Sequence, residues 1–401
     1  MRFIHTSDWH IGQRLYNNDR YSEFELYFDW LSNRIHDSKA QCLLVCGDIF
    51  DLSNPSNISL EQYYKALWKL KSVGLKKIII IGGNHDSVLT LNAPAEILKH
   101  LDIHIIGNVK ESIQEQIINI YNSDNQLIAV VAAIPFLRER DLRKQVAGES
   151  FEEKIEASKK AMANHYAQMA EFIGKINVPI ITTGHFMLSG SMQSDSERQI
   201  FVGNLSGIDI ENFPEFYDYF ALGHIHRHQN IQGKNHVAYS GSPLPLSFSE
   251  RSDPKFHIEF DVNQNQIENI TPIEVPKFRN LLKFEGSLNE IITQVNKYQN
   301  DLPLETWAEI HVVEKEYIPL IRNDIDNFIE SVSNLKILKY TYNFENQSET
   351  TTEAFTKNLT DLLPENVFRA HISKLNVVGE EDLMSTFLEL CQQVAENHED
   401  S

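Results

Sequence analysis

The fold of this chain is decided by the stretch Ile78-Ile79-Ile80-Ile81-Gly82-Gly83-Asn84-His85-Asp86. Four consecutive β-branched residues predict a buried strand, because short apolar runs of this kind are typical of strands covered on both faces. The glycines that follow let the backbone turn and approach other groups closely. Asn84, His85 and Asp86 come next, so side chains that can bind a metal ion lie directly at the end of a buried strand.

Four other segments show the same arrangement, an apolar run followed by polar residues. The apolar runs are expected to be strands at residues 3–6, 43–45, 180–183 and 220–223. The polar residues that follow them are Asp8-Trp9-His10, Gly47-Asp48-Ile49-Phe50-Asp51, Gly184-His185 and Gly223-His224-Ile225-His226. Loops that leave the same edge of a parallel sheet converge in space. The sequence therefore predicts one site built from distant segments.

Helices are expected between several of these strands. Apolar residues recur at a spacing of three or four at Phe24, Phe28, Leu31 and Ile35, and again at Leu60, Tyr64, Leu67 and Leu70. This spacing gives a helix one apolar face that packs against a sheet. Strands that alternate with helices predict an α/β core.

The residue types at the strand ends predict a centre with two metal ions. Residues two apart in extended backbone point the same way, so Asp8 and His10 can enter one site together. The same holds for His224 and His226. Asp48 is the candidate carboxylate that bridges two ions, and the mixture of imidazole, carboxylate and amide ligands suits Mn, Fe or Zn better than Ca. A lone Gly-His is common, but all these segments in this order indicate a metal centre.

Composition bounds the class of protein. The chain has 401 residues, of which 42% are hydrophobic, so most of it is expected to fold. Neither an apolar leader segment nor a membrane-spanning run is found, so we expect a soluble protein with no membrane partner. Cys42 and Cys46 lie inside an apolar run, so we expect buried free thiols and a cytoplasmic location. The net charge of −20 argues against tight DNA binding by this chain alone, because Lys and Arg normally neutralise phosphates. Bound cations or a basic partner would offset that charge.

The sequence changes character near residue 275. Runs at 236–241 and 256–262 follow each other without a helix and predict antiparallel strands that close a core, residues 1–275. Residues 276–345 predict a second, α+β domain. Its expected elements after a first strand are a helix at Leu288–Tyr298, a strand at Trp307–Val313, a helix at Leu320–Val332 and a strand at Ile337–Phe344.

Two further segments complete the chain. Residues 346–358 read as a polar linker, and residues 359–401 as two amphipathic helices that begin at Pro364 and Glu380. The second helix is acidic on its polar face. It is either a solvated surface helix or a helix that docks on a partner, and the sequence favours neither.

The metal-type segments, in their order, resemble the signature of the calcineurin-like metallophosphoesterases. The similarity extends to the SbcD family of bacterial nuclease subunits, through motifs at His5–Gly12, Gly47–Asp51, Gly83–Ser87, Ile134–Arg138, Leu222–His226, Gly241–Pro243 and Ser247–Glu250. The resemblance implies an α/β fold: a four-layered metallophosphoesterase sandwich with a small α+β capping domain and a C-terminal helical segment that binds a partner.

The resemblance also implies a role for each residue of the site. The ligands of one ion would be Asp8, His10, Asp48 and His226, and those of the other Asp48, Asn84, His185 and His224, with Asp48 bridging. His85 would act on the scissile phosphate and help the leaving oxygen depart; the alternatives are an extra ligand or a structural histidine. Asp51 would orient His85 or the site water. Asp86 would hold the loop rather than bind metal.

By the same resemblance, the chain would be a nuclease that uses two divalent ions, Mn first, with Mg, Fe and Zn as alternatives. It would act as a double-strand 3′-5′ exonuclease and as an endonuclease on single strands and hairpins. Residues 276–345 would place DNA over the metals, and residues 359–401 would bind an SbcC-type coiled-coil ATPase. A homodimer would form through Ser59–Ser72 and Leu91–Leu101, although these apolar faces also fit ordinary core contacts.

Two rival functions stay open at this point. Metal ligands alone do not fix the substrate, so another phosphoester, in a phosphoprotein or a cyclic nucleotide, is the first rival. The second is a non-catalytic scaffold that has kept the fold. The presence of every expected ligand argues against the scaffold.

Overall fold

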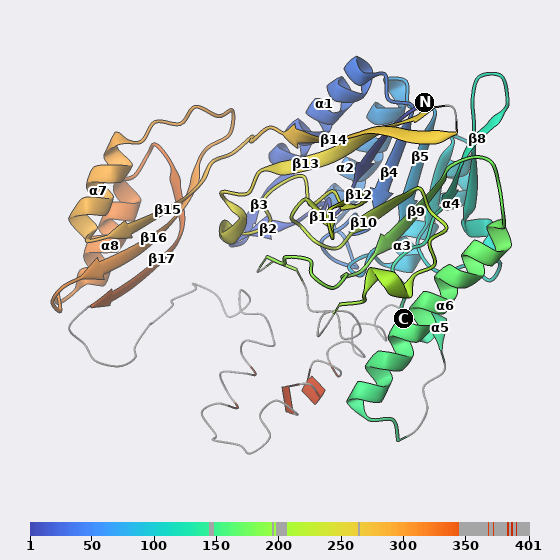
Figure 1. Ribbon diagram of the computed structural model, residues 1–401. Helices are drawn as coiled ribbons and strands as arrows, with labels where there is room; N and C mark the ends of the chain where they lie inside the picture. The colour runs from blue at the N-terminus through green and yellow to red at the C-terminus, as the bar shows by residue number, and fades with distance from the viewer. Residues whose placement is uncertain are drawn as a thin grey trace.

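The computed structural model describes residues 1–143, 148–194, 196–197, 207–263 and 265–344, and in the C-terminal region residues 368, 372, 383, 384, 386, 387 and 390. Two six-stranded sheets dominate these ranges, and a three-stranded sheet forms a smaller unit. Figure 1 shows the smaller unit, in orange, beside the two stacked sheets.

The first large sheet has the order β14-β13-β1-β4-β5-β6. Its strands are β1 (Arg2–Thr6), β4 (Cys42–Cys46), β5 (Lys77–Ile81), β6 (Ile103–Ile106), β13 (Lys255–Asn263) and β14 (Gln266–Val275). β1, β4, β5 and β6 run parallel, while β13 pairs antiparallel with both β1 and β14. The strands predicted at 3–6, 43–45 and 78–81 are therefore confirmed, side by side in one sheet.

The second large sheet has the order β11-β12-β10-β9-β8-β7. Its strands are β7 (Ile117–Tyr121), β8 (Leu127–Ala132), β9 (Ile180–His185), β10 (Tyr219–Gly223), β11 (Gln229–Ile231) and β12 (Lys234–Tyr239). β12 pairs parallel with β10 and antiparallel with β11, and β13 pairs antiparallel with β1 and β14. The antiparallel strands predicted at 236–241 and 256–262 are therefore present, but they lie in different sheets. The chain crosses from one sheet to the other between β12 and β13, which explains why two strands without a helix between them do not form a hairpin.

Helices cover the outer faces of both sheets. The first sheet carries α1 (Tyr21–Ser38), α2 (Asn57–Ser72), α3 (Val88–Asn92) and α4 (Ala95–Lys99), and the second carries α5 (Glu139–Leu142) and α6 (Phe151–Ile173). Ile78 and Ile80 pack beneath α1 and α2, whereas Ile79 and Ile81 face the second sheet. This double burial is the reason for four consecutive isoleucines. The predicted four-layered sandwich is confirmed.

The apolar face predicted for α2 needs a correction. Leu67 and Leu70 are buried as expected, but Tyr64 is 39% exposed and Tyr63 takes the buried position. Trp68, on the same helix, is 69% exposed. The helix therefore carries apolar side chains on two faces, only one of which packs on the sheet.

The smaller unit contains the elements expected between residues 276 and 345. Its parallel strands are β15 (Leu281–Gly286), β16 (Trp307–Glu314) and β17 (Lys336–Phe344), and its helices are α7 (Leu288–Lys297) and α8 (Ile321–Ser331). Both helices pack on one face of this sheet. The edge near Leu281 and Trp307 packs on Leu15 and Phe248 of the core. Close by, Tyr16, between β2 (Arg14–Leu15) and β3 (Asn18–Asp19), hydrogen-bonds to Glu309.

The C-terminal predictions fall mostly outside the described residues. The polar linker predicted at 346–358 lies outside them entirely. Of the predicted helices, Phe368, Ile372, Leu383 and Phe387 are helical, and the rings of Phe368 and Phe387 stack with centroids 4.0 Å apart. Leu383 and Leu390 expose 39% and 54% of their surface. None of the helices in the described ranges has the length and apolar content that a bilayer crossing requires.

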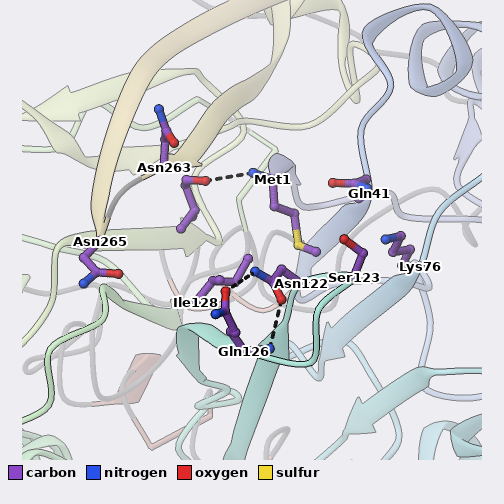
Figure 2. A pocket seen from close by; sticks show the side chains of 10 residues that line it. Met1, Gln41, Lys76, Asn122, Ser123, Gln126, Ile128, Asn263 and Asn265 are labelled. Carbon is purple, nitrogen blue, oxygen red and sulfur yellow. Dashed lines mark hydrogen bonds between the residues drawn. The ribbon is translucent and has the colours of Figure 1, made fainter.

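A polar hollow of about 380 Å³ lies where the strands of the first sheet begin. Figure 2 shows Met1 within it, beside Asn122 and Gln126 of the β7–β8 turn. Asn122 Nδ2 donates to Gln126 Oε1 at 3.0 Å, and the Gln126 amide donates to Asn122 Oδ1 at 2.9 Å. The predicted ligands follow the opposite ends of the parallel strands, so this hollow is separate from their site.

Candidate metal centre

The predicted ligands converge at the ends of strands from both sheets. Asp8 and Asp48 follow β1 and β4 of the first sheet, and Asn84 follows β5. His185 and His224 come from the ends of β9 and β10 in the second sheet. The site therefore lies where the two sheets meet, and neither sheet alone provides it.

The loops that carry the ligands have unusual backbone conformations. The φ values of four ligands are positive, a backbone region that residues other than glycine rarely adopt. They are +53° at Asp8, +48° at His10, +50° at Asp48 and +98° at His224. Such residues persist only where the surroundings hold them, and they cluster at functional sites. Four of the seven predicted ligands thus have a strained backbone.

Two glycines make room for the ligands. A Cβ atom on Gly83 would lie 2.1 Å from Asp48 Oδ1, and one on Gly47 would lie 2.2 Å from His185 Nδ1. Gly47 also has a φ of +86°. The backbones of β4 and β5 therefore approach Asp48 and His185 more closely than any other residue type allows.

One group of ligands gathers around Asn84. Its Oδ1 lies 2.9 Å from His185 Nε2 and 3.2 Å from His224 Nδ1. Asp48 Oδ2 lies 3.3 Å from the same His185 nitrogen. The other ring nitrogen of His185 donates to the Cys46 carbonyl at 2.9 Å, so Nε2 is directed at two oxygen atoms. These are the four residues expected around one ion.

The second group consists of Asp8, His10 and His226, whose ligand atoms lie within 4.8 Å of one another. The His10 and His226 rings meet edge to face, with centroids 5.0 Å apart. The Asp8 carboxylate accepts hydrogen bonds from Ser7 Oγ at 2.5 Å and from the His224 amide at 2.9 Å. The bond to His224 joins residues from different sheets and links the two groups.

Asp48 lies between the two groups, as a bridging ligand must. Its Oδ2 is 3.6 Å from His10 Nε2, besides the 3.3 Å to His185 Nε2. Its Oδ1 accepts a hydrogen bond from the His85 amide at 2.9 Å. One carboxylate oxygen is therefore held by the backbone while the other faces both groups.

The site contains a buried carboxylate whose negative charge would favour bound cations. Burial raises the pKa of Asp8. Burial also disfavours the charged form of Asp48, yet the nearby rings of His185 and His85 hold the pKa of Asp48 well below its usual value. Burial opposes a charge on His185 too, but Asp48 raises the pKa of His185 to about 9. A fully buried carboxylate thus stays ionised at the centre of the site.

The donor set fits divalent ions of the Mn, Fe or Zn type. Both ring nitrogens of His10 are buried and make no hydrogen bond, and buried polar atoms of native proteins normally have a partner. His10 Nδ1 lies 3.3 Å from Asp51 Oδ1 but outside hydrogen-bonding geometry. An ion bound by His10 would give one of these nitrogens a partner, and imidazole and carboxylate ligands together suit these metals.

His85 and Asp51 lie beside the ligands. His85 Nδ1 lies 2.7 Å from the backbone carbonyl of Asp51 and donates to it, while Nε2 lies 3.9 Å from Asp48 Oδ2. The Asp51 side chain is directed at His10 instead. Asp51 therefore holds His85 through its backbone carbonyl, and its side chain lies beside His10. His10, Asp51 and His85 also lie close enough together to hold an ion, which keeps the extra-ligand alternative for His85 open.

Asp86 holds the loop, as predicted. Its carboxylate accepts hydrogen bonds from the backbone amides of Gly83, Ile49 and Phe50 at 2.9, 3.1 and 3.0 Å. Its backbone carbonyl accepts a bond from Arg138 Nη2 at 2.9 Å. Asp86 thus ties the loop after β5 to the loop after β4, which fixes Asn84 relative to Asp48.

Several side chains that contact the ligands were not predicted from the sequence. Ser7 bonds to Asp8, Ser196 to His226, and Arg138 to the loop of Asn84. Glu250 and Arg138 lie in the motifs Ser247–Glu250 and Ile134–Arg138, which resemble the SbcD family. That family similarity was the only feature of the sequence that pointed to these two residues. No spacing rule points to them, because each reaches the site from a distant segment.

Comparisons with known proteins agree with this geometry. The family model of calcineurin-like phosphoesterases matches residues 1–228, and the model described as the type 5 capsule protein repressor C-terminal domain matches residues 277–375. SbcD of Escherichia coli K12, a component of the nuclease SbcCD, is 31% identical over 407 aligned positions, which cover 100% of both chains. The SbcD protein of Bacillus subtilis is 29% identical over 78% of this chain and 79% of its own length.

A solved structure described as the anchor GAP50 in the inner membrane complex of Plasmodium aligns with 69% of this chain and 89% of its own at 12% identity and a TM-score of 0.35, values too low to carry weight. The full-length relative and the model that covers more than half of the residues are decisive. The chain belongs to the calcineurin-like phosphoesterases and, among them, to the SbcD family of SbcCD nuclease components.

Proposed function

We propose that this chain hydrolyses phosphodiester bonds of DNA at two divalent ions, as the nuclease subunit that works with an SbcC-type coiled-coil ATPase. The observation that carries the proposal is Asp48, which stands between two groups of ligands with one oxygen facing both. Family membership supports the nuclease activity and the use of divalent metals. Mn is the ion we propose for both sites, because it accepts imidazole and carboxylate together.

The proposed first ion is held by Asp8, His10, Asp48 and His226, and the second by Asp48, Asn84, His185 and His224. Two ions bound there would supply an activated water and positive charge against the phosphate. The chain itself fixes the ligands before substrate arrives, since Asp86 locks the loops of Asn84 and Asp48 together. This preorganisation avoids rearrangement during the reaction.

We propose that His85 acts on the reacting phosphate rather than on metal. The Asp51 carbonyl accepts a hydrogen bond from Nδ1, and we propose that the ring is protonated when it acts. Nε2 of that ring then carries a hydrogen it can donate to the departing oxygen. Asp51 acts through His85 and His10 and is a positioning residue in this scheme.

The other regions receive roles on the same basis. We propose that residues 1–275 form the nuclease core, that residues 276–345 cap the site and place DNA ends, hairpins or single strands over it, and that residues 359–401 bind the ATPase. Support for the cap comes from its contact with the segment just after His10, through Tyr16 and Glu309. The free thiols of Cys42 and Cys46 are buried and suit a cytoplasmic location.

The first prediction tests the metal assignment. Asp48→Ala or His224→Ala should reduce bound Mn²⁺ and lower hairpin-DNA cleavage to background, because each removes a ligand. Metal content by mass spectrometry and cleavage are measured on the same preparation, with circular dichroism as the check on folding. Asp37→Ala, at a 72% exposed side chain, is the matched control.

An assay of the parental protein on three substrates separates the rival functions. Parental protein with Mn²⁺ is given hairpin DNA, a phosphopeptide and a cyclic nucleotide. Cleavage of DNA alone is expected. Cleavage of only the phosphopeptide or the cyclic nucleotide would replace the nuclease proposal, and no cleavage of any substrate would favour the scaffold.

The second prediction concerns His85. His85→Gln should keep both ions and lose about 10²–10⁴-fold in single-turnover cleavage, the usual range for general acid catalysis. His36→Gln, at a 75% exposed side chain, should cleave at the parental rate. Loss of one ion in the His85 variant would make this residue a ligand instead.

The third prediction concerns the C-terminal helices. Truncation at Thr360 should abolish capture of the SbcC-type ATPase in a pull-down and spare Mn²⁺-dependent cleavage of single-stranded DNA. The double variant Leu383→Glu/Leu390→Glu should do the same, because both side chains are exposed and apolar. Leu320→Glu, 71% exposed in the smaller unit, should retain the ATPase. Capture by the truncated chain would reject the docking role and favour a solvated surface helix.

The fourth prediction concerns a homodimer. Ile58, Trp68, Leu89 and Ile97, on or beside α2–α4, expose 56%, 69%, 67% and 73% of their surface, and exposed apolar groups of this size mark interaction sites. We propose that a second copy covers them. Trp68→Glu/Ile97→Glu should convert a dimer to a monomer in sedimentation velocity, while Phe172→Glu on α6, 55% exposed, should not. A parental monomer would contradict the proposal.

A further inference from the structure

His226 is held by a buried network that metal binding alone does not require. Its Nδ1 lies 2.6 Å from Ser196 Oγ and 3.6 Å from Glu250 Oε1. Ser196 Oγ in turn hydrogen-bonds to the same carboxylate oxygen of Glu250. Ser196 therefore connects the ring of His226 to Glu250.

An ion pair fixes the charge of Glu250. Lys255 Nζ lies 2.5 Å from Glu250 Oε2, and the two side chains are only 5% and 1% exposed. The Leu246 amide also donates to Oε2, at 3.1 Å. A buried ammonium so close to a carboxylate keeps both groups charged, since either one alone would be costly to bury.

The charge of Glu250 sets the direction of each hydrogen bond. An ionised carboxylate only accepts, so Ser196 must donate its single hydroxyl hydrogen to Glu250. The Ser196 oxygen can then only accept from the ring, which places the imidazole hydrogen of His226 on Nδ1. The lone pair of the ring is left on Nε2, the nitrogen available to a metal ion.

The backbone of His226 is fixed by the same region of the chain. Its amide donates to Glu197 Oε1 at 2.9 Å. Its carbonyl accepts from Lys255 Nζ and from the Ser242 amide, both at 3.1 Å. Ser242 and Glu250 belong to the motifs Gly241–Pro243 and Ser247–Glu250, which the proposed reaction leaves without a role.

We propose that Glu250 is a positioning residue of the metal centre: through Ser196 it selects the tautomer and orientation of His226, and Lys255 keeps it ionised. The inference rests on the proposed role of His226 as a ligand. Removal of a group that orients a metal-binding histidine typically weakens metal binding about 10–100-fold. Only the ion held by Asp8, His10 and His226 should be affected.

Calorimetric titration of the metal-free, full-length protein with Mn²⁺ tests this. Ser196→Ala and Glu250→Gln should each weaken one of two Mn²⁺ sites about 10–100-fold and leave the other unchanged. Cleavage should recover when Mn²⁺ is raised by the same factor, whereas a general loss of structure would not be rescued. Ser196→Thr keeps the hydroxyl and should bind both ions as the parental protein does.

Two controls separate positioning from stability. Glu259→Gln changes a buried carboxylate that pairs with Arg34 and His257 away from the site, and it should lower the melting temperature without changing Mn²⁺ affinity. Glu250→Gln/Lys255→Met removes the unpaired ammonium that Glu250→Gln leaves. It should fold better than the single variant and still bind one ion weakly.

Each outcome has one meaning. Parental affinity at both sites in Ser196→Ala and Glu250→Gln overturns the positioning role. Equal weakening of both sites overturns it as well. His226→Ala tests the proposed role of His226 as a metal ligand. If this variant still binds two ions with parental affinity, His226 is not a ligand and the proposed set of metal ligands is wrong. Loss of one ion in His226→Ala, with no effect of Glu250→Gln or Ser196→Ala, rejects only the inference about Glu250.

Discussion

The close approach of backbones at the strand ends is the constraint on which the site depends. A Cβ atom on Gly223 would lie 1.8 Å from the Cys46 carbonyl oxygen, so the end of β10 presses on the end of β4 across the gap between the sheets. The contacts at Gly47 and Gly83 are similarly tight. The nearest atoms are the backbone of Cys46 at Gly223 and the buried side chains of His185 and Asp48 at Gly47 and Gly83. The position of Asp48 between its imidazole neighbours follows from this packing, and so does the short reach from one sheet to the other.

The strained ligand loops can exist because other groups restrain them. Left-handed backbone at a residue such as Asp8 or His10 costs of order 1–3 kcal/mol at each position. Asp86 and the amides it binds hold the loops after β4 and β5, and Ser7 with the His224 amide hold Asp8. The sandwich thus supports a geometry that the isolated loops would not adopt. A rigid arrangement of this kind suits the proposed centre, in which two ions of like charge would lie close together.

Much of the site could be predicted from the sequence because its signals are local. The polar residues at each strand end and the isoleucines at 78–81 need no knowledge of distant contacts. The pairing of β12 with β10 could not be predicted, since a strand carries no local mark of its neighbour. Tyr64 was misplaced because α2 is apolar on two faces, and spacing alone does not say which face meets the sheet. Glu250 and Lys255 contact His226 from 24 and 29 residues away in sequence, and no motif spacing reveals such contacts.

The hydrogen bond from the His224 amide to Asp8 spans 216 positions of the chain. During synthesis on the ribosome, the first sheet emerges without the histidines at 185, 224 and 226. It also lacks β13, the antiparallel neighbour of β1. A nascent chain at that stage carries Asp8, His10, Asp48 and Asn84 but not the complete set of proposed ligands. The proposed metal centre can therefore form only after His185, His224 and His226 have been made and both sheets have closed on each other.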